Sequence, residues 1–271
     1  MLTLFLSLWV MAGFWVGLHQ VLKWGNAWSV ILSIFLGVGL FMGGMYLIRR
    51  RITAIMAAIQ ARITERNNTL MRKYQQLGSR AGGNVKQLMD QARRDQDAIL
   101  SEALAATQKM EPYGKWSLLL DRQINAIRLQ FLYQLRRFEE VDRILPKTLF
   151  ADPVLCCMKM CRQYKRGEDA ALKKSYDKYR KKYKFDATLI YATYAWMLLR
   201  KKQTDEARQV LLDGKKATEN EVLEKNWEHV TNGRLNQFSN AELGESWYAL
   251  LLEEPKQPKP RVQRQVQRRR F

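Results

Sequence analysis

The sequence predicts an all-α membrane protein with two transmembrane helices, a juxtamembrane helical hairpin and an α-solenoid of helix pairs. Three observations lead to this prediction. The first 48 residues hold two long apolar runs around a short polar break. The remainder is rich in Ala, Leu, Lys, Arg, Gln and Glu, which favour helices, and poor in alternating β-type segments. Motifs typical of helix-to-helix joints recur after 29 and 37 residues.

Residues 1–48 are expected to form a two-helix transmembrane hairpin. Residues 1–22 and 27–48 carry no charge, and about 20 apolar residues in a helix suffice to cross a bilayer. The connector 23–26 offers one lysine, whereas Arg49, Arg50 and Arg51 directly follow the second run. Because cations are retained inside, both termini are predicted to be cytoplasmic, at a bacterial-type inner (plasma) membrane. A cleaved signal peptide is the alternative, but a basic n-region and a small-residue cleavage site are missing.

Small residues recur at four-residue spacing in both runs. They include Gly13, Gly17, Gly37, Gly39 and Gly43. This spacing lets a second helix approach closely, so these glycines are expected to pack helices in the membrane. We expect the two spans to pack on each other. The alternative is a homo-oligomer formed through the glycines of the second apolar run, 27–48.

Residues 49–111 are predicted to form a basic juxtamembrane helical hairpin or coiled coil. Residues 49–86 hold nine Lys/Arg against the single acid Glu65, whereas the helix after the Gly-rich break at 78–83 is acidic-leaning. Opposite charge on two consecutive helices favours antiparallel pairing. A heptad-like apolar seam supports it, and its residues on the basic helix are Ile52, Met56, Ile59, Ile63, Leu70 and Leu77.

The cationic face of the first of these helices has two interpretations. Contact with anionic lipid contributes about 1 kcal/mol for each cation near the surface. The candidate residues are Arg49, Arg50, Arg51, Arg62 and Arg66. The other interpretation is a solvated face with no specific partner.

Residues 112–254 are predicted to form a helical repeat domain. Similar five-residue segments, each starting a second helix, begin at Arg137, Arg166 and Gln203. Asp152 before Pro153 is typical of a helix N-cap. Capping-box spacing is found at Thr218…Glu221 and Ser239…Glu242. A final helix pair, 221–232 and 240–253, is expected to close the stack.

The third unit of this domain resembles the tetratricopeptide repeat (TPR) family. The matching large and small positions are Tyr191, Tyr194, Ala195 and Leu198 on its first helix and Ala207, Leu211 and Gly214 on its second. The resemblance implies a TPR-like solenoid whose groove binds a protein partner. Two spans followed by such repeats also resemble the layout of haem-biosynthesis-associated membrane proteins.

Residues suited to catalysis or metal binding are few. Cys156, Cys157 and Cys161 are expected to be buried thiols, because a structural zinc site needs four ligands and the histidines, His19 and His229, lie far away. Neither paired carboxylates in an apolar context nor a phosphate-cradling glycine loop is visible. We therefore expect neither an enzyme nor a cofactor.

Residues 255–271 are predicted to be a disordered basic tail. Its candidate contact residues are Arg264, Arg268, Arg269 and Arg270. The favoured function is a membrane-anchored adaptor or assembly factor that binds a protein through its repeat groove. The alternative is a membrane-tethered protein that contacts nucleic acid or the ribosome through this tail and through the Lys/Tyr-rich helices at 173–196.

Overall fold

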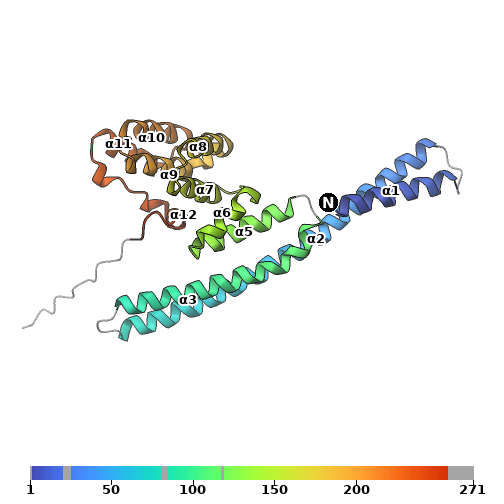
Figure 1. Cartoon of the computed structure of the whole chain (residues 1–271), viewed down its shortest axis with the longest axis horizontal. Coiled ribbons are helices and arrows are strands. Elements are labelled where there is room, and N and C mark those ends of the chain that lie inside the picture. The colour runs from blue at the N-terminus through green and yellow to red at the C-terminus, as the bar shows by residue number, and fades with distance from the viewer. Residues whose placement is uncertain (1, 21–25, 81–84, 117–118, 256–271) are drawn as a thin grey trace, which may run out of the picture. The chain divides into compact units, whose positions relative to one another are not determined.

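The chain is helical throughout the part that the structure describes. The computed structural model describes residues 2–20, 26–80, 85–116 and 119–255. Its regular elements there are α-helices and short 3₁₀ helices, without a strand, so the all-α prediction is confirmed for these residues. The chain divides into two compact units, Met1–Ala151 and Asp152–Phe271 (Figure 1). The predicted division into 1–48, 49–111, 112–254 and 255–271 stays a prediction.

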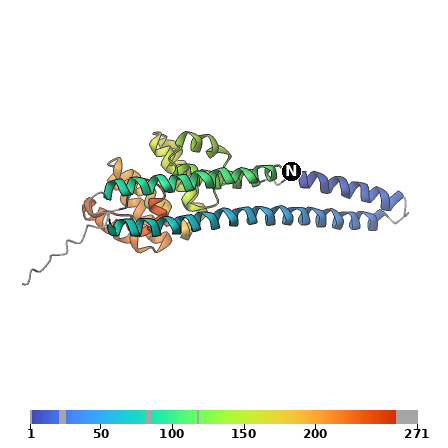
Figure 2. The same ribbon diagram turned by 90° about the horizontal axis from the view of Figure 1, so that it is seen from below.

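The first unit is built around one long helix, α2 (Asn26–Arg80). Its first half is apolar and its second half basic, and no Gly or Pro occurs between residues 45 and 77. Without a helix breaker, the helix continues unbroken past Arg49. Figures 1 and 2 show α1 (Leu2–Gln20) beside the first half of α2 and α3 (Val85–Ala106) beside its second half.

Among the described residues, α2 is the one helix long and apolar enough to cross a membrane. α1 contains a shorter apolar stretch, Thr3–Gly17. Large apolar side chains of α2 point outward, including Trp28, which is 70% exposed, and Phe35, which is 73% exposed. Asn26, predicted to lie in the connector, begins α2, and the rest of that connector lies outside the described residues.

α1 and α2 meet through small residues. Ser29, Ser33 and Gly37, spaced four apart on α2, are buried, as is Ser7 on α1. A Cβ on Gly37 would lie 3.1 Å from the Cβ of Met11, so a larger residue would force a shift. The Ser33 hydroxyl donates to the Ser29 carbonyl oxygen at 2.7 Å, which satisfies this buried polar group locally.

The other four predicted packing glycines lie outside this contact. A Cβ on Gly13, Gly17, Gly39 or Gly43 would meet no described atom within 4 Å. Gly39 lies two residues beyond Gly37, about 200° around the helix, so both cannot face α1. The close approach of α1 and α2 is therefore made at Gly37 instead. Packing of Gly39 and Gly43 against a second copy stays a prediction.

The second half of α2 pairs with α3 as an antiparallel hairpin, as the charge pattern predicted. Arg62 and Arg66 both contact Glu102, at 3.1 and 3.2 Å, and Lys73 contacts Asp95 at 2.9 Å. Because the contacting residue numbers rise along α2 while they fall along α3, the two helices are antiparallel. The apolar seam between the helices is only partly covered, because two helices alone cannot enclose it. Within the seam, the side chains below one-tenth exposure are Ile59, Ile99 and Ala103.

A small core joins the next segment to α2 just after the apolar half. This segment comprises a 3₁₀ turn (η1, Thr107–Met110), α4 (Glu111–Gly114) and α5 (Leu120–Gln134). Met110, Leu120 and Ile124 are buried against α2 side chains from Ile48 to Met56. Arg128 ties the segment together by donating to Thr107 Oγ1 at 2.9 Å and to Glu111 Oε1 at 2.6 Å.

The rest of the chain forms short helices joined by tight turns. Their bounds are α6 Phe138–Ile144, η2 Leu145–Lys147, α7 Pro153–Lys165, α8 Asp169–Tyr183, η3 Lys184–Ala187, α9 Thr188–Arg200, α10 Thr204–Thr218, α11 Glu221–Thr231, η4 Leu235–Gln237, η5 Ala241–Leu243 and α12 Glu245–Tyr248. The three predicted joints lie between α5 and α6, α7 and α8, and α9 and α10, so their placement is confirmed.

These joints share one backbone geometry. A residue with positive φ stands at each, namely Arg136, Gly167 and Lys202, and the next amide donates to the carbonyl five residues earlier. Gly233 after α11 repeats the arrangement. A residue in this left-handed conformation ends a helix, because it lets the following amide donate to one of the last carbonyls of that helix. The same turn thus recurs at intervals near the roughly 34-residue period of helix-pair repeats.

α9 is the central helix of the second unit. Ten successive residues from Leu189 to Leu198 are buried. The helix packs against α7, α8, α10 and α11, so every side of it is covered. Gly214 on α10 allows the close approach, because a Cβ there would lie within 2.9 Å of Tyr191 and of Leu223. All seven residues that carry the TPR resemblance are buried, and membership of that family stays a prediction.

Two helix starts in the second unit test the predicted caps. Asp152 caps α7 as predicted, because its carboxylate accepts from the Val154 amide at 2.7 Å. Thr218 is not the cap of α11. It ends α10 with its hydroxyl donated to the Gly214 carbonyl, and Asn220 caps α11 by accepting from the Val222 amide at 3.0 Å.

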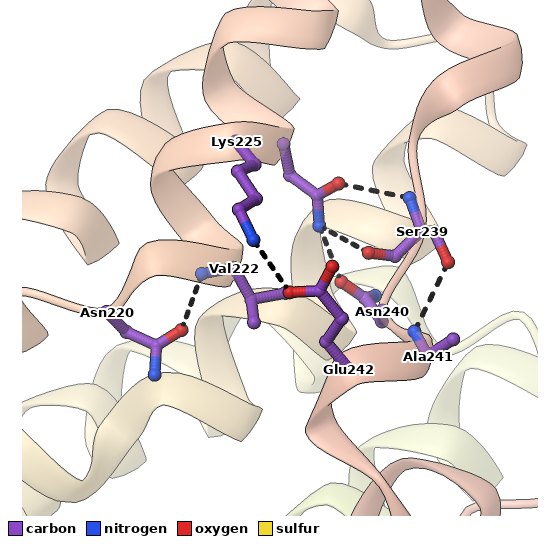
Figure 3. A network of polar contacts seen from close by, with 8 residues as sticks. Asn220, Val222, Lys225, Ser239, Asn240, Ala241 and Glu242 are labelled. Atoms are coloured by element: carbon purple, nitrogen blue, oxygen red, sulfur yellow. Dashed lines mark hydrogen bonds and ion pairs between the residues drawn. The ribbon is translucent and has the colours of Figure 1, made fainter.

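The predicted helix at 240–253 is also wrong. Only Glu245–Tyr248 is α-helical, because Gly244 adopts a positive φ of 63° between η5 and α12. Asn226 on α11 donates to the Ser239 carbonyl and to Asn240 Oδ1, which holds this segment. Ser239 and Asn240 are labelled in Figure 3. A buried polar network thus replaces the expected helix pairing.

The last described residues close over α9. Glu253 accepts hydrogen bonds from the indole N–H groups of Trp196, at 2.7 Å, and Trp247, at 3.0 Å. Both indoles are buried, Trp247 completely. The carboxylate therefore fastens the C-terminal segment onto the central helix by satisfying two buried donors.

Candidate functional site

A groove with a volume of about 370 Å³ lies between α2 and α3 in the first unit. Apolar side chains from both helices form its floor. The lining comprises Ile55, Ala58, Ile59, Arg62, Ile63, Arg66, Ile99, Glu102, Ala103, Ala106 and Lys109. The groove forms because alanines stand where larger side chains would fill the open side of the seam.

Charged side chains form the rim of this groove, called the α2–α3 groove below. Glu102 accepts from both Arg62 and Arg66, and Lys109 adds a third cation to the lining. Three cations against one carboxylate leave an excess of positive charge. The arginine side chains remain 66% and 54% exposed, so they can still meet another anion.

Further along the hairpin, Asp95 joins the two helices. It accepts from the Lys73 ammonium and the Tyr74 hydroxyl, both at 2.9 Å. The hydrogen bond from Lys73 lowers the pKa of Asp95, and Asp95 in turn raises the pKa of Lys73. Burial raises the pKa of Tyr74, and its hydrogen bond to Asp95 adds to the effect. The shifts of Lys73 and Asp95 favour their paired charged forms, and that of Tyr74 favours its neutral hydroxyl, which donates to Asp95.

A smaller depression of about 140 Å³ lies in the second unit, between α8, α9 and the start of α10. Its rim is polar. Asp169 pairs with Lys201, whose ammonium also lies 5.6 Å from the ring centre of Tyr164. Leu172, Tyr194 and other side chains line the depression, which is below the roughly 300–1,000 Å³ of small-molecule sites.

The three cysteines are buried thiols, as predicted. Burial raises the pKa of the Cys156 thiol to about 11 and raises that of Cys157 well above its ordinary value. Thiolate, which is the reactive form, is therefore scarce at neutral pH. Among the described residues, no group of three His, Cys, Asp or Glu side chains could hold a metal ion.

The tyrosines of the Lys/Tyr region pack inside the second unit. Tyr176 stacks on Tyr194 with ring centres 4.1 Å apart and meets Tyr191 edge to face, and all three are buried. Burial raises the pKa of Tyr176 and of Tyr179 above the ordinary tyrosine value. Buried rings cannot stack on nucleobases, so these three tyrosines are core side chains, whereas Phe185 of the same region is 77% exposed.

The remaining predicted contact residues have different outcomes. Arg49, Arg50 and Arg51 are exposed on α2, and the lipid contact stays a prediction. Arg62 and Arg66, predicted with them, lie on the rim of the α2–α3 groove. The tail candidates Arg264, Arg268, Arg269 and Arg270 lie outside the described residues.

Sequence reasoning did not single out the α2–α3 groove. A sequence signal was present, since Ala58 and Ala106 interrupt the larger apolar residues near Ile55 and Ile99.

No protein-family model matches the chain, and comparisons with curated proteins and with solved structures found no match.

Proposed function

We propose that this protein is a membrane-anchored, non-catalytic adaptor that holds an amphipathic helix of a protein partner in the α2–α3 groove. The observation that carries the proposal is the groove itself: an apolar floor with a cationic rim, on a helix that continues directly from an apolar, membrane-length segment. A helix laid into an apolar groove is a common mode of peptide recognition.

The anchor proposed here comprises α1 and the first half of α2, with both termini cytoplasmic. The outward apolar side chains of this part, such as Phe5, Trp9 and Phe35, favour lipid as their surroundings. Arg49, Arg50 and Arg51 favour retention of the following residues on the cytoplasmic side. TPR-like pairs in the second unit would then add a second binding surface.

The groove lies close to the bilayer in this arrangement. Ile55 follows Ile48, the last apolar residue of the run, by seven residues, or about 10 Å of helix. Since no Gly or Pro separates them, the anchor holds the groove at a nearly fixed height above the membrane. A partner bound there would be kept at the membrane surface, which is the work of an adaptor or assembly factor.

Charge selects the occupant of the groove. Arg62, Arg66 and Lys109 outnumber Glu102, so a helix with acidic residues beside its apolar stripe complements the rim. In a symmetric dimer the same patch would face itself, and like charges would meet. These relations favour an acidic partner helix over a second copy of the chain.

The nucleic-acid alternative has less support. It required several aromatic rings available for stacking, but Tyr176, Tyr191 and Tyr194 are buried, and among the described residues 173–196 Phe185 is the one large ring that is highly exposed, at 77%. The depression between α8, α9 and α10 is a second candidate for protein binding, because its polar rim suits a short peptide. It is smaller and less apolar than the α2–α3 groove.

Site-specific photo-crosslinking in cells tests the proposal. A benzophenone amino acid is placed at Ala58 or Ala106, which line the groove, and at Ala61 or Ala105, neighbouring alanines that do not. We expect a protein adduct at Ala58 and Ala106 but not at the controls, and the crosslinked peptide should be an acidic amphipathic segment. Ile63→Arg, which places a charged side chain in the apolar floor of the groove, should abolish the adduct.

Three results would contradict the proposal. Equal adducts at Ala58 and Ala61 would mean that the groove is not the contact. An adduct with a second copy of the chain would indicate a homo-oligomer. An adduct that disappears with nuclease would favour the nucleic-acid alternative.

A further inference from the structure

Trp116 and Leu119 are exposed apolar residues between α4 and α5, and Trp116 lies beside the first turn of α1. Trp116 is 38% exposed and Leu119 is 44% exposed, although both stand beside a buried core. Monomeric soluble surfaces rarely gather large apolar side chains without a partner. The residues packed against this segment indicate which partner.

A direct hydrogen bond ties Trp116 to the first turn of α1. The Thr3 hydroxyl donates to the Trp116 carbonyl oxygen at 2.6 Å, and Thr3 is itself mostly buried. Thr3 also lies beside α2, because a Cβ on Gly44 would be 3.6 Å from its methyl carbon. Trp116 is therefore held beside the ends of both apolar helical stretches.

The small core around Met110 lies at the same height along α2 as Trp116. Met110, Leu120 and Ile124 pack against side chains that begin at Ile48, where the apolar half of α2 ends and Arg49 follows. If α2 crosses a bilayer with its apolar half, this level is the interface between headgroups and acyl chains. Tryptophan favours that interface because its ring is apolar and its N–H is polar.

We propose that Trp116 and Leu119 insert into the cytoplasmic headgroup layer and form a second, peripheral membrane contact. This inference rests on the proposed membrane anchor but adds a contact that no transmembrane segment supplies. Together with the core at Met110, the contact would fix the tilt of α2 relative to the bilayer. The occupant of this apolar surface is thus the bilayer, reached by continuity with the outward apolar side chains of α1, such as Leu4 and Phe5.

Spin-label depth measurements on the full chain in phosphatidylglycerol-containing nanodiscs test this inference. Labels are attached at Trp116→Cys and, independently, at Leu119→Cys; the native cysteines are buried, and the unsubstituted chain serves as the blank. Leu77→Cys is the aqueous control, because Leu77 is also 38% exposed and lies about 44 Å of helix beyond Ile48. Phe35→Cys is the control for the anchor.

We expect collisions with oxygen, relative to a water-soluble nickel complex, to be higher at positions 116 and 119 than at 77 and lower than at 35. Values at 116 and 119 equal to that at 77, with position 35 deep in the bilayer, would overturn the peripheral contact and leave the anchor intact. An aqueous value at position 35 would overturn the anchor and the peripheral contact with it.

Discussion

Replacing Glu253 by Ala removes the acceptor of two buried indole N–H groups. Trp247 is fully buried and Trp196 is 7% exposed, so water reaches neither ring freely. An unsatisfied buried donor costs about 1–3 kcal/mol. The ion pair with Arg200 at 3.9 Å contributes little, because the arginine side chain is 60% exposed. We therefore expect the free energy that holds residues 244–253 against α9 to fall by about 3 kcal/mol.

Hydrogen exchange followed by mass spectrometry on the full chain in detergent measures this loss locally. A change of about 3 kcal/mol corresponds to exchange about 100-fold faster in peptides from α12 and the residues after it. Glu253→Gln, which keeps one carbonyl acceptor, should show a smaller increase. The matched control is Glu254→Ala, at the neighbouring exposed position. Unchanged exchange in Glu253→Ala would refute the argument that this carboxylate fastens the C-terminal segment.

Three further predictions follow from the same structure. Lys202→Gly should raise the free energy of unfolding of the second unit by about 1 kcal/mol and Gly167→Ala should lower it by a similar amount, measured by denaturant titration, because both positions have positive φ; opposite signs would contradict the joint geometry. Cys156, with a thiol pKa raised to about 11, should react slowly with a thiol reagent at pH 8 in the folded chain and fast in denaturant; equal rates would show that it is not buried. Asp95→Asn should speed hydrogen exchange in α3 at pH 7 and should do so less at an acidic pH below about 3.9: the lowered pKa of Asp95 means that its stabilising contribution is present above the unfolded pKa of about 3.9 and is lost as the pH falls through the folded value. An equal effect at both pH values would exclude the charged pair as the cause.

Much of the architecture could be predicted because it depends on local or periodic signals. The joints at Arg137, Arg166 and Gln203 and the cap at Asp152 are set by a few adjacent residues. The pairing of α2 with α3 follows from opposite charge, which is a property of whole helices. The failures lie where local signals compete. Thr218 has capping-box spacing, but its hydroxyl bonds back to Gly214 within α10, and Asn220 takes the cap.

The candidate site was less predictable than the fold. A list of glycines at four-residue spacing does not say which face of each helix meets the other, and of the five predicted glycines only Gly37 faces the partner helix here. Likewise, Arg62 and Arg66 look like part of one basic face until Glu102 is brought between them from α3. The groove exists only once two helices are aligned in register.

By itself, the sequence determined the helical class, the apolar N-terminal segments and the positions of most turns, because periodicity, charge and capping act over a few residues. The tertiary structure decided which small residues pack and that alanines at 58 and 106 face one groove. It also brought Trp116 to Thr3. Such contacts join residues far apart in the chain, and their energy depends on packing between surfaces that no local pattern specifies.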